Sequence, residues 1–136
     1  MKRPITEAIE TILAADDAQR YLAAQDAALE HAREQYAQLC ELARHDQRVA
    51  VRWEALQLIS LLQSPDHRQV LEAALKEDSD SDVRDCAKAL VFRSVVSENV
   101  RKSGKLTDAA MLAYEMDVRS QAAQGLFGHP TVPDEQ

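Results

Sequence analysis

Glycine and proline are scarce in this sequence, and their distribution argues against folds that depend on frequent turns. There are three Gly and four Pro, and neither residue occurs between Ile5 and Ser64. A run of that length without the usual turn-forming and helix-breaking residues, rich in Ala, Leu, Gln, Glu and Arg, favours helix almost throughout. We therefore predict an all-α protein.

Cysteines and long apolar segments are also few. Cys40 and Cys86 form no CxxC pair, and a disulfide framework in so short a chain would need more cysteines. Both lie among apolar neighbours at helical spacing, which predicts reduced core cysteines in a cytoplasmic protein. The N-terminal stretch MKRPITEAIETILAADD has no long apolar run, so neither a secretory signal nor a membrane span is expected.

Motifs that carry chemistry are absent from the sequence. It contains no GxSxG, HExxH, GxxxxGK[ST] or GxGxxG, and three glycines leave little material for a phosphate-binding loop. His31 and Glu34 have a spacing that could bind a metal, but nothing nearby completes a set of about four ligands. His129 lies in the C-terminal stretch GHPTVPDEQ. We predict no catalytic residue, metal or cofactor, and no enzymatic activity.

The charge balance is acidic, at −7, with 16 Lys and Arg against 23 Asp and Glu. Such a chain is repelled by phosphate backbones unless its basic residues gather on one face. One basic cluster exists, and a solvated helix end is the simpler explanation for it: Lys88, Arg93, Arg101, Lys102 and Lys105. Nucleic acid is therefore a disfavoured partner.

Three aspartates at alternate positions, Asp78, Asp80 and Asp82, resemble the start of a calcium-binding loop. That loop type needs Gly at its sixth position and Glu at its twelfth. Here the sixth residue is Val83 and the twelfth is Ala89. A β-branched residue resists the turn and Ala offers no ligand, so a calcium site is not predicted.

The same segment is instead part of an internal repeat. When the chain is shifted by about 32 residues, YAQLCELARHDQRVAVRWEALQLI lies over RQVLEAALKEDSDSDVRDCAKALV, which aligns the aspartates, the Val-Arg pairs and the apolar positions that follow. A further copy of the second half occurs at residues 117–127, as DVRSQAAQGLF.

Each unit predicts two helices joined by a short turn. We expect Ser64 to cap the first helix, with Pro65 as its first residue, and the turn to span Asp78–Ser81. The second helix would begin at Val83 with Asp82 or Ser81 as its cap, leaving Asp80 only solvated. A single helical pair cannot bury both faces, so such units stack.

A turn aspartate followed by V-R-x-x-A-x-x-[AL]-[LI] resembles the HEAT-like repeats. The resemblance implies a short right-handed α-solenoid of stacked antiparallel helix pairs, with about 6–7 helices in all. The implied single domain comprises residues 1–128, with capping helices at 1–44, repeats at 34–63 and 66–95, a terminal helix or partial repeat at 107–127, and a flexible tail at 129–136.

Two regions keep open alternatives. The N-terminal layer is either a degenerate helix pair or one long helix of period seven (Leu22, Leu29, Tyr36, Ala43). The basic segment 97–106 is either a rigid connector or a mobile loop.

The resemblance further implies a polar ladder in which arginines at the start of second helices pair with turn aspartates of the same or the neighbouring repeat. The residues of this ladder would be Asp46, Arg52, Asp78, Arg84 and Arg119.

In solenoids of this kind the polar positions of the second helices select the partner. The corresponding candidates here are Trp53, Glu54, Gln57, Ser60, Asp85, Lys88, Arg119, Ser120 and Gln124. The residues equivalent to Trp53 are polar, so Trp53 is either an exposed anchor or a cover for the gap between the capping layer and the first repeat.

The resemblance leads us to expect a non-catalytic protein-binding module, such as a small inhibitor, an immunity-type protein or an adaptor subunit. Its acidity favours a basic protein partner, and it would be a monomer or a homodimer. The alternatives are an enzyme or enzyme subunit similar to the bilin lyases, which needs an enclosed pocket with a reactive group, and a nucleic-acid-binding protein similar to HEAT-like glycosylases, which needs a basic concave face.

Overall fold

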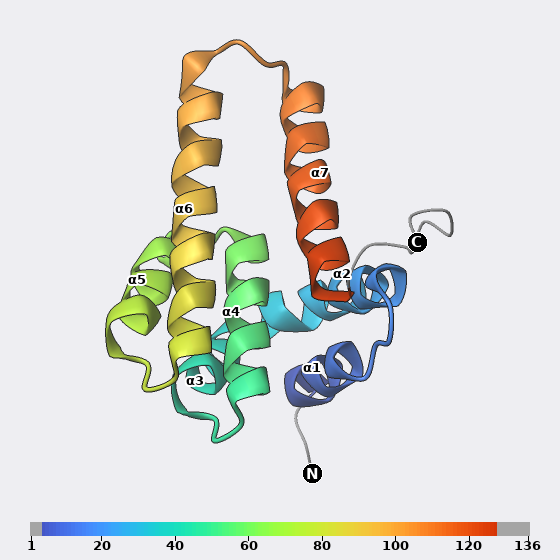
Figure 1. Cartoon of the computed structure of the whole chain (residues 1–136), viewed down its shortest axis with the longest axis vertical. Coiled ribbons are helices and arrows are strands. Elements are labelled where there is room, and N and C mark those ends of the chain that lie inside the picture. Colours follow the sequence, from blue (N-terminus) through green and yellow to red (C-terminus); the bar gives the residue numbers. More distant parts are fainter. Residues whose placement is uncertain (1–3, 128–136) are drawn as a thin grey trace, which may run out of the picture.

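The structure, a computed structural model, describes residues 4–127, and that range holds seven α-helices and no strand (Figure 1). The helices are α1 (Pro4–Leu13), α2 (Ala18–Glu34), α3 (Tyr36–His45), α4 (Val49–Leu62), α5 (His67–Glu77), α6 (Ser81–Ser103) and α7 (Asp108–Phe127). The all-α prediction is confirmed. The predicted tail at 129–136, with His129, lies outside the described residues. Within 4–127 no helix is long and apolar enough to cross a membrane.

Helix α4 lies at the centre of the core and is buried on most of its sides. Helices α1, α2, α3, α5 and α6 all pack against it. Helix α1 contributes Ile5, Ile9 and Ile12, which lie on one stripe at i, i+4 and i+7 and are almost fully buried. The buried residues of α4 are Val51, Arg52, Glu54, Ala55, Leu56, Leu58 and Ile59.

The turns within the pairs α3–α4 and α5–α6 share the same hydrogen bonds. In the first turn Arg52 Nη1 donates to the backbone oxygen of Asp46 at 2.8 Å, and in the second Arg84 Nη1 donates to that of Asp78 at 2.8 Å. The Oδ1 atom of each aspartate accepts from the backbone N–H two residues later, at 2.8 Å and 2.9 Å. The sequence repeat therefore corresponds to a repeated local structure.

An ion pair joins the two turns. Arg52 donates through Nε and Nη2 to the carboxylate of Asp78, at 3.0 Å and 3.2 Å. The two side chains are only 11% and 6% exposed. This is the predicted pairing between an arginine and the turn aspartate of the neighbouring repeat. The other ladder positions differ, because Arg84 meets a backbone carbonyl at Asp78 and the carboxylate of Asp46 binds Arg48.

The predicted caps of α5 and α6 were wrong. Helix α6 begins at Ser81, and its N-cap is Asp80, which we had expected to be only solvated. The Oδ1 atom of Asp80 accepts from the backbone N–H groups of Asp82 at 2.8 Å and Val83 at 3.2 Å. Helix α5 begins only at His67. Ser64 does not cap it, because its hydroxyl lies 2.7 Å from Tyr36 Oη.

The N-terminal layer consists of separate helices that pack together, α1 against α2. The alternative of one long helix of period seven is wrong, because the chain leaves helical geometry at Gln35 (φ −118°, ψ 40°), between α2 and α3. Gln35 instead binds this layer through its side chain, whose Oε1 accepts from the backbone N–H of Ile5 at 2.9 Å.

The C-terminal part is a long helical arm. Helix α6 continues through most of the 97–106 segment to Ser103 and ends at Gly104, whose φ of +68° suits glycine. The predicted alternatives for 107–127 resolve to one helix, α7. It runs back beside α6, but its main packing partner is α2 (Figure 1).

Candidate functional site

The candidate site is a cavity of about 180 Å³ between α2, α4, α6 and α7, which we call the α7 cavity. Its lining combines a Trp, a Cys and two Arg with apolar residues, and consists of Tyr21, Gln25, Trp53, Gln57, Leu61, Cys86, Ala89, Leu90, Arg93, Arg119, Ala122, Ala123 and Leu126. Known small-molecule sites span roughly 300–1,000 Å³, so this cavity fits one side chain better than a cofactor.

Trp53, Gln57 and Cys86 form the side of the cavity contributed by α4 and α6. Trp53 is partly buried and packs against the core. Gln57 Nε2 donates to the Cys86 sulfur at 3.4 Å. Burial raises the pKa of the Cys86 thiol to about 12. Because the thiolate is the reactive form, Cys86 is a poor nucleophile at neutral pH.

A buried carboxylate lies behind this wall. Glu54 is 0% exposed and accepts two hydrogen bonds from α2, one from the Tyr21 hydroxyl at 2.7 Å and one from Gln25 Nε2 at 2.6 Å. Desolvation raises the pKa of Glu54 to about 7, although both hydrogen bonds oppose that rise. Desolvation together with Glu54 also raises the pKa of Tyr21.

Arg119 connects α7 to the same network. Its Nη1 donates to Asp26 at 2.7 Å, and its Nη2 donates to Gln25 Oε1 at 3.1 Å. The rings of Tyr21 and Phe127 add an edge-to-face contact, with centroids 5.7 Å apart. The buried Nε–H of Arg119 has no acceptor within the described residues. These contacts fix the C-terminal half of α7 on α2.

Arg93 is the other cation of the cavity, and unlike Arg119 it has no anionic partner among the described residues. Across residues 4–127 it makes no hydrogen bond or ion pair, although its side chain is partly buried. Desolvation by this partial burial lowers the pKa of Arg93. The cavity therefore carries a guanidinium for which residues 4–127 supply no hydrogen-bond acceptor.

The predicted partner-binding residues are only partly brought together. Trp53, Gln57 and Arg119 line the α7 cavity. Ser60 and Ser120 are half-buried, whereas Asp85, Lys88 and Gln124 are exposed. Glu54 is a correction, since it is fully buried and cannot meet a partner. Arg119 also departs from the predicted ladder, because its partner Asp26 lies in α2 and not in a turn.

Tyr21, Gln25 and Arg93 were missed as members of a site. Arg93 belongs to the basic cluster found in the sequence, but its neighbours in that cluster are exposed. The sequence did contain one indication of its position, because Cys86, Leu90 and Arg93 are spaced at i, i+4 and i+7 and so share one face of a helix. Nothing in the sequence near Tyr21 or Gln25 indicated their contact with α4.

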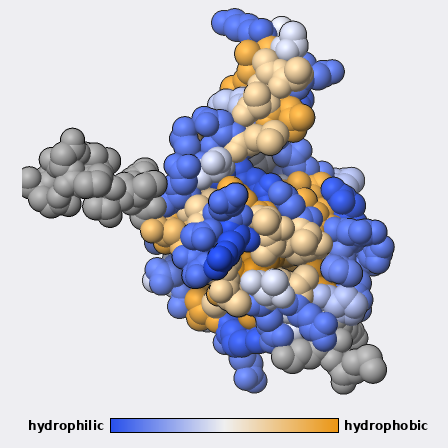
Figure 2. Space-filling view, turned by 90° about the vertical axis from the view of Figure 1, so that its right-hand side faces the viewer, coloured by the Kyte–Doolittle hydropathy of each residue, from blue (hydrophilic) through white to orange (hydrophobic). Residues whose placement is uncertain are grey.

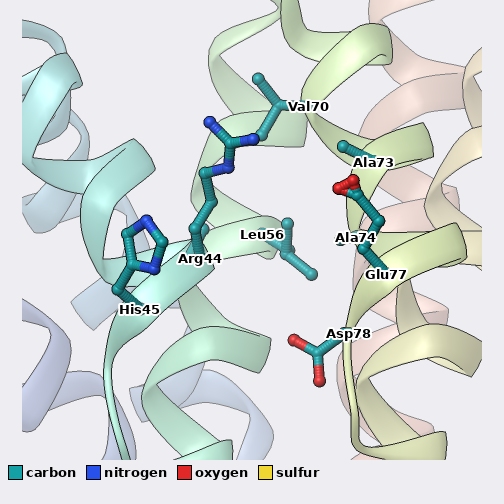
Figure 3. Close-up of a pocket in the computed structure, with 9 residues that line it drawn as sticks. Arg44, His45, Leu56, Val70, Ala73, Ala74, Glu77 and Asp78 are labelled. Atoms are coloured by element: carbon teal, nitrogen blue, oxygen red, sulfur yellow. The ribbon is translucent and has the colours of Figure 1, made fainter.

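A second cavity, of about 200 Å³, lies between α3 and α5 (Figure 3). Arg44 and His45 come from the end of α3, and Glu77 lies on the opposite side, with Leu56 between them. Arg44, His45 and Glu77 are exposed, and Asp78 is already paired with Arg52. Its charged groups are thus solvated or satisfied, in contrast to Arg93.

Among the described residues no group of three or more His, Cys, Asp or Glu could hold a metal ion. His31 and Glu34, whose spacing could bind a metal, are both exposed to solvent. Comparison of the chain with protein-family models, curated proteins and solved structures gives no match.

Proposed function

We propose that this chain is a non-catalytic protein-binding module whose partner surface is the α6–α7 arm together with the adjoining α7 cavity. One observation carries the proposal. Of the nine large apolar side chains that are exposed among the described residues, seven fall within residues 92–127: Phe92, Val95, Leu106, Leu112, Met116, Leu126 and Phe127. Concentrated exposed apolar surface is typical of an interaction site.

The shape of the arm supports this assignment. Phe92 is 70% exposed, and Leu112 and Met116 are each 61% exposed. In the view of Figure 2 apolar atoms are visible on the part that projects at the top, which Figure 1 identifies as the ends of α6 and α7. A projecting pair of helices offers a partner two helix faces.

The repeat supports the class of module. We propose that α3–α6 form two HEAT-like repeats of a short solenoid, because both turns have the same arginine-to-carbonyl hydrogen bond and the same aspartate turn. Such arrays use their surfaces for protein binding. An inhibitor, immunity-type protein or adaptor suits a chain of this length, and the net charge of −7 favours a partner with a basic surface around the apolar contact.

The alternative of an enzyme similar to the bilin lyases requires a carboxylate that lines the interior of an enclosed pocket. Glu54 is the carboxylate nearest to that description, and Tyr21 and Gln25 separate it from the α7 cavity. It therefore lends that alternative no support.

Affinity capture with tagged protein from cells of the source organism tests the proposal. The variant Leu112→Ser/Met116→Ser removes apolar surface from the arm, and Leu13→Ser is a matched control because Leu13 is 40% exposed on α1. We expect wild type and Leu13→Ser to retain the same protein and the arm variant to lose it, with unchanged circular dichroism.

Two results would contradict the proposal. The arm variant could retain the same protein as wild type, which would place the contact elsewhere. Alternatively, light scattering could show a dimer that becomes a monomer in the arm variant. The arm would then be a contact between copies of this chain.

A further inference from the structure

Arg93 is the feature of the α7 cavity that the fold itself leaves unexplained. The partly buried charge has lost part of its hydration, and no acceptor among residues 4–127 replaces it. Burying a charge without a partner costs free energy, so an uncompensated guanidinium is uncommon in a cavity wall. The wall also contains Arg119, whose buried Nε–H finds no acceptor in the part of the chain that the structure describes.

The remaining lining limits what an occupant can be. Trp53, Leu61, Leu90 and Leu126 supply apolar surface, and the volume of about 180 Å³ is sufficient for one side chain. A guanidinium matches the geometry of a carboxylate through two parallel hydrogen bonds. A phosphate carries up to two charges at neutral pH, and a cavity with one unpaired cation would leave part of that charge uncompensated.

We propose that the α7 cavity binds an acidic side chain of the protein partner, with its carboxylate paired to Arg93 and its methylene groups against Trp53. This rests on the proposed function, since it names the group that the partner inserts beside the apolar arm. Net charge does not oppose it, because recognition in a cavity depends on the local charge, which Arg93 makes positive there.

The sequence contains one Trp, so the indole N–H signal of Trp53 reports on the cavity alone. The probes are N-acetyl-glutamate N-methylamide and its glutamine analogue, which has nearly the same shape and no charge. Ligands of this size reach affinities on the order of millimolar. We expect the glutamate compound to shift the Trp53 signal saturably, and the glutamine compound to bind at least ~10-fold more weakly.

Arg93→Gln should reduce binding of the glutamate compound to the level of the glutamine compound, and Arg93→Lys should retain part of it. Lys76→Gln is the matched control, because Lys76 is an exposed cation on α5 and does not line the cavity. Its affinity should equal that of wild type. The amide spectrum of each variant confirms its fold independently of the titration.

The proposal is overturned if both probes bind equally, if Arg93→Gln binds like wild type, or if the glutamate compound causes no shift at 50-fold above the expected millimolar range. Tighter binding by Asp134→Asn/Glu135→Gln would also overturn it, since the chain's own carboxylates would then be the occupant. If the capture experiment succeeds and this titration fails, only the inference about Arg93 falls. If the titration succeeds and capture fails, the proposed function falls instead.

Discussion

Replacing Glu54 by glutamine should remove a loss of stability that wild type undergoes as the pH rises from about 4.5 to about 7. Glu54 is fully buried, and desolvation raises the pKa of its carboxyl in the folded protein to about 7. In the unfolded chain the group ionises near its ordinary value of 4.5. Between these two values the unfolded state releases a proton that the folded state keeps.

The sign follows from that difference. A raised folded-state pKa contributes stability that is fully present below about 4.5, that is lost progressively up to about 7, and that does not change further above it. At about 1.4 kcal/mol per pH unit, the interval corresponds to about 3 kcal/mol. Domains of this size have about 5–15 kcal/mol of stability in total, so the effect is large enough to measure.

The groups around Glu54 do not titrate in this interval in a way that mimics the effect. Tyr21 and Gln25 donate hydrogen bonds to it, and Arg119 provides a weaker attraction that lowers its pKa. Desolvation also raises the pKa of Tyr21, so that hydroxyl stays protonated. The Cys86 thiol, with a pKa of about 12, is neutral as well.

Urea unfolding followed by circular dichroism, at half-unit steps from pH 4.5 to 8, measures the free energy of unfolding. The quantity of interest is wild type minus Glu54→Gln, because the contributions of other carboxyls cancel. We expect it to fall by about 3 kcal/mol across the range. Glu30→Gln, at an exposed position on α2, is the control for loss of one carboxylate and should leave the free energy of unfolding within about 0.5 kcal/mol of wild type. A flat curve for Glu54→Gln would refute the reasoning, and so would a curve that rises with pH.

Three further predictions follow from the buried groups and the caps. Arg52→Ala leaves a buried carboxylate without its cation and should lower the free energy of unfolding by about 3–5 kcal/mol in urea titrations; a loss below about 1 kcal/mol would contradict this. Asp80→Ala should lower the free energy of unfolding by about 1 kcal/mol, and Asp82→Ala should lower it by less than half of that, in thermal or urea unfolding. Equal losses for the two variants would show that Asp80 is not the cap. In a Cys40→Ser background, Cys86 should react with a disulfide reagent at pH 8 at least ~100-fold more slowly in the folded state than in urea, and a ratio near one would disprove its burial.

The repeated turns were predictable because local sequence determines them. The offset of 32 residues aligned Asp46 with Asp78 and Arg52 with Arg84, and the structure gives both turns the same hydrogen bonds. In both turns the arginine lies six residues after the aspartate whose carbonyl it meets, so the contact stays within one short segment. The choice of cap was less predictable, because Asp80, Ser81 and Asp82 are all good cap residues and only the backbone geometry distinguishes them.

Glu54 shows why the site was harder to predict than the fold. A carboxylate is normally an exposed residue, and only contact with Tyr21 and Gln25 of α2 makes its burial tolerable. Those partners are 33 and 29 residues away in sequence, so periodicity cannot show them. One signal was present, since the repeat places Glu54 on Cys86, an apolar residue at a core position.

The α7 cavity results from the place where the chain departs from its own repeat. The third copy of the motif aligns Arg119 with Arg52 and Arg84. Arg119 instead pairs with Asp26 of α2, so α7 packs mainly against α2. The face of α6 that carries Cys86, Leu90 and Arg93 lines a cavity, with Arg93 as a cation that no described residue pairs. The same departure that ends the repeat pattern thus creates the positive, partly apolar surface on which the proposed partner contact depends.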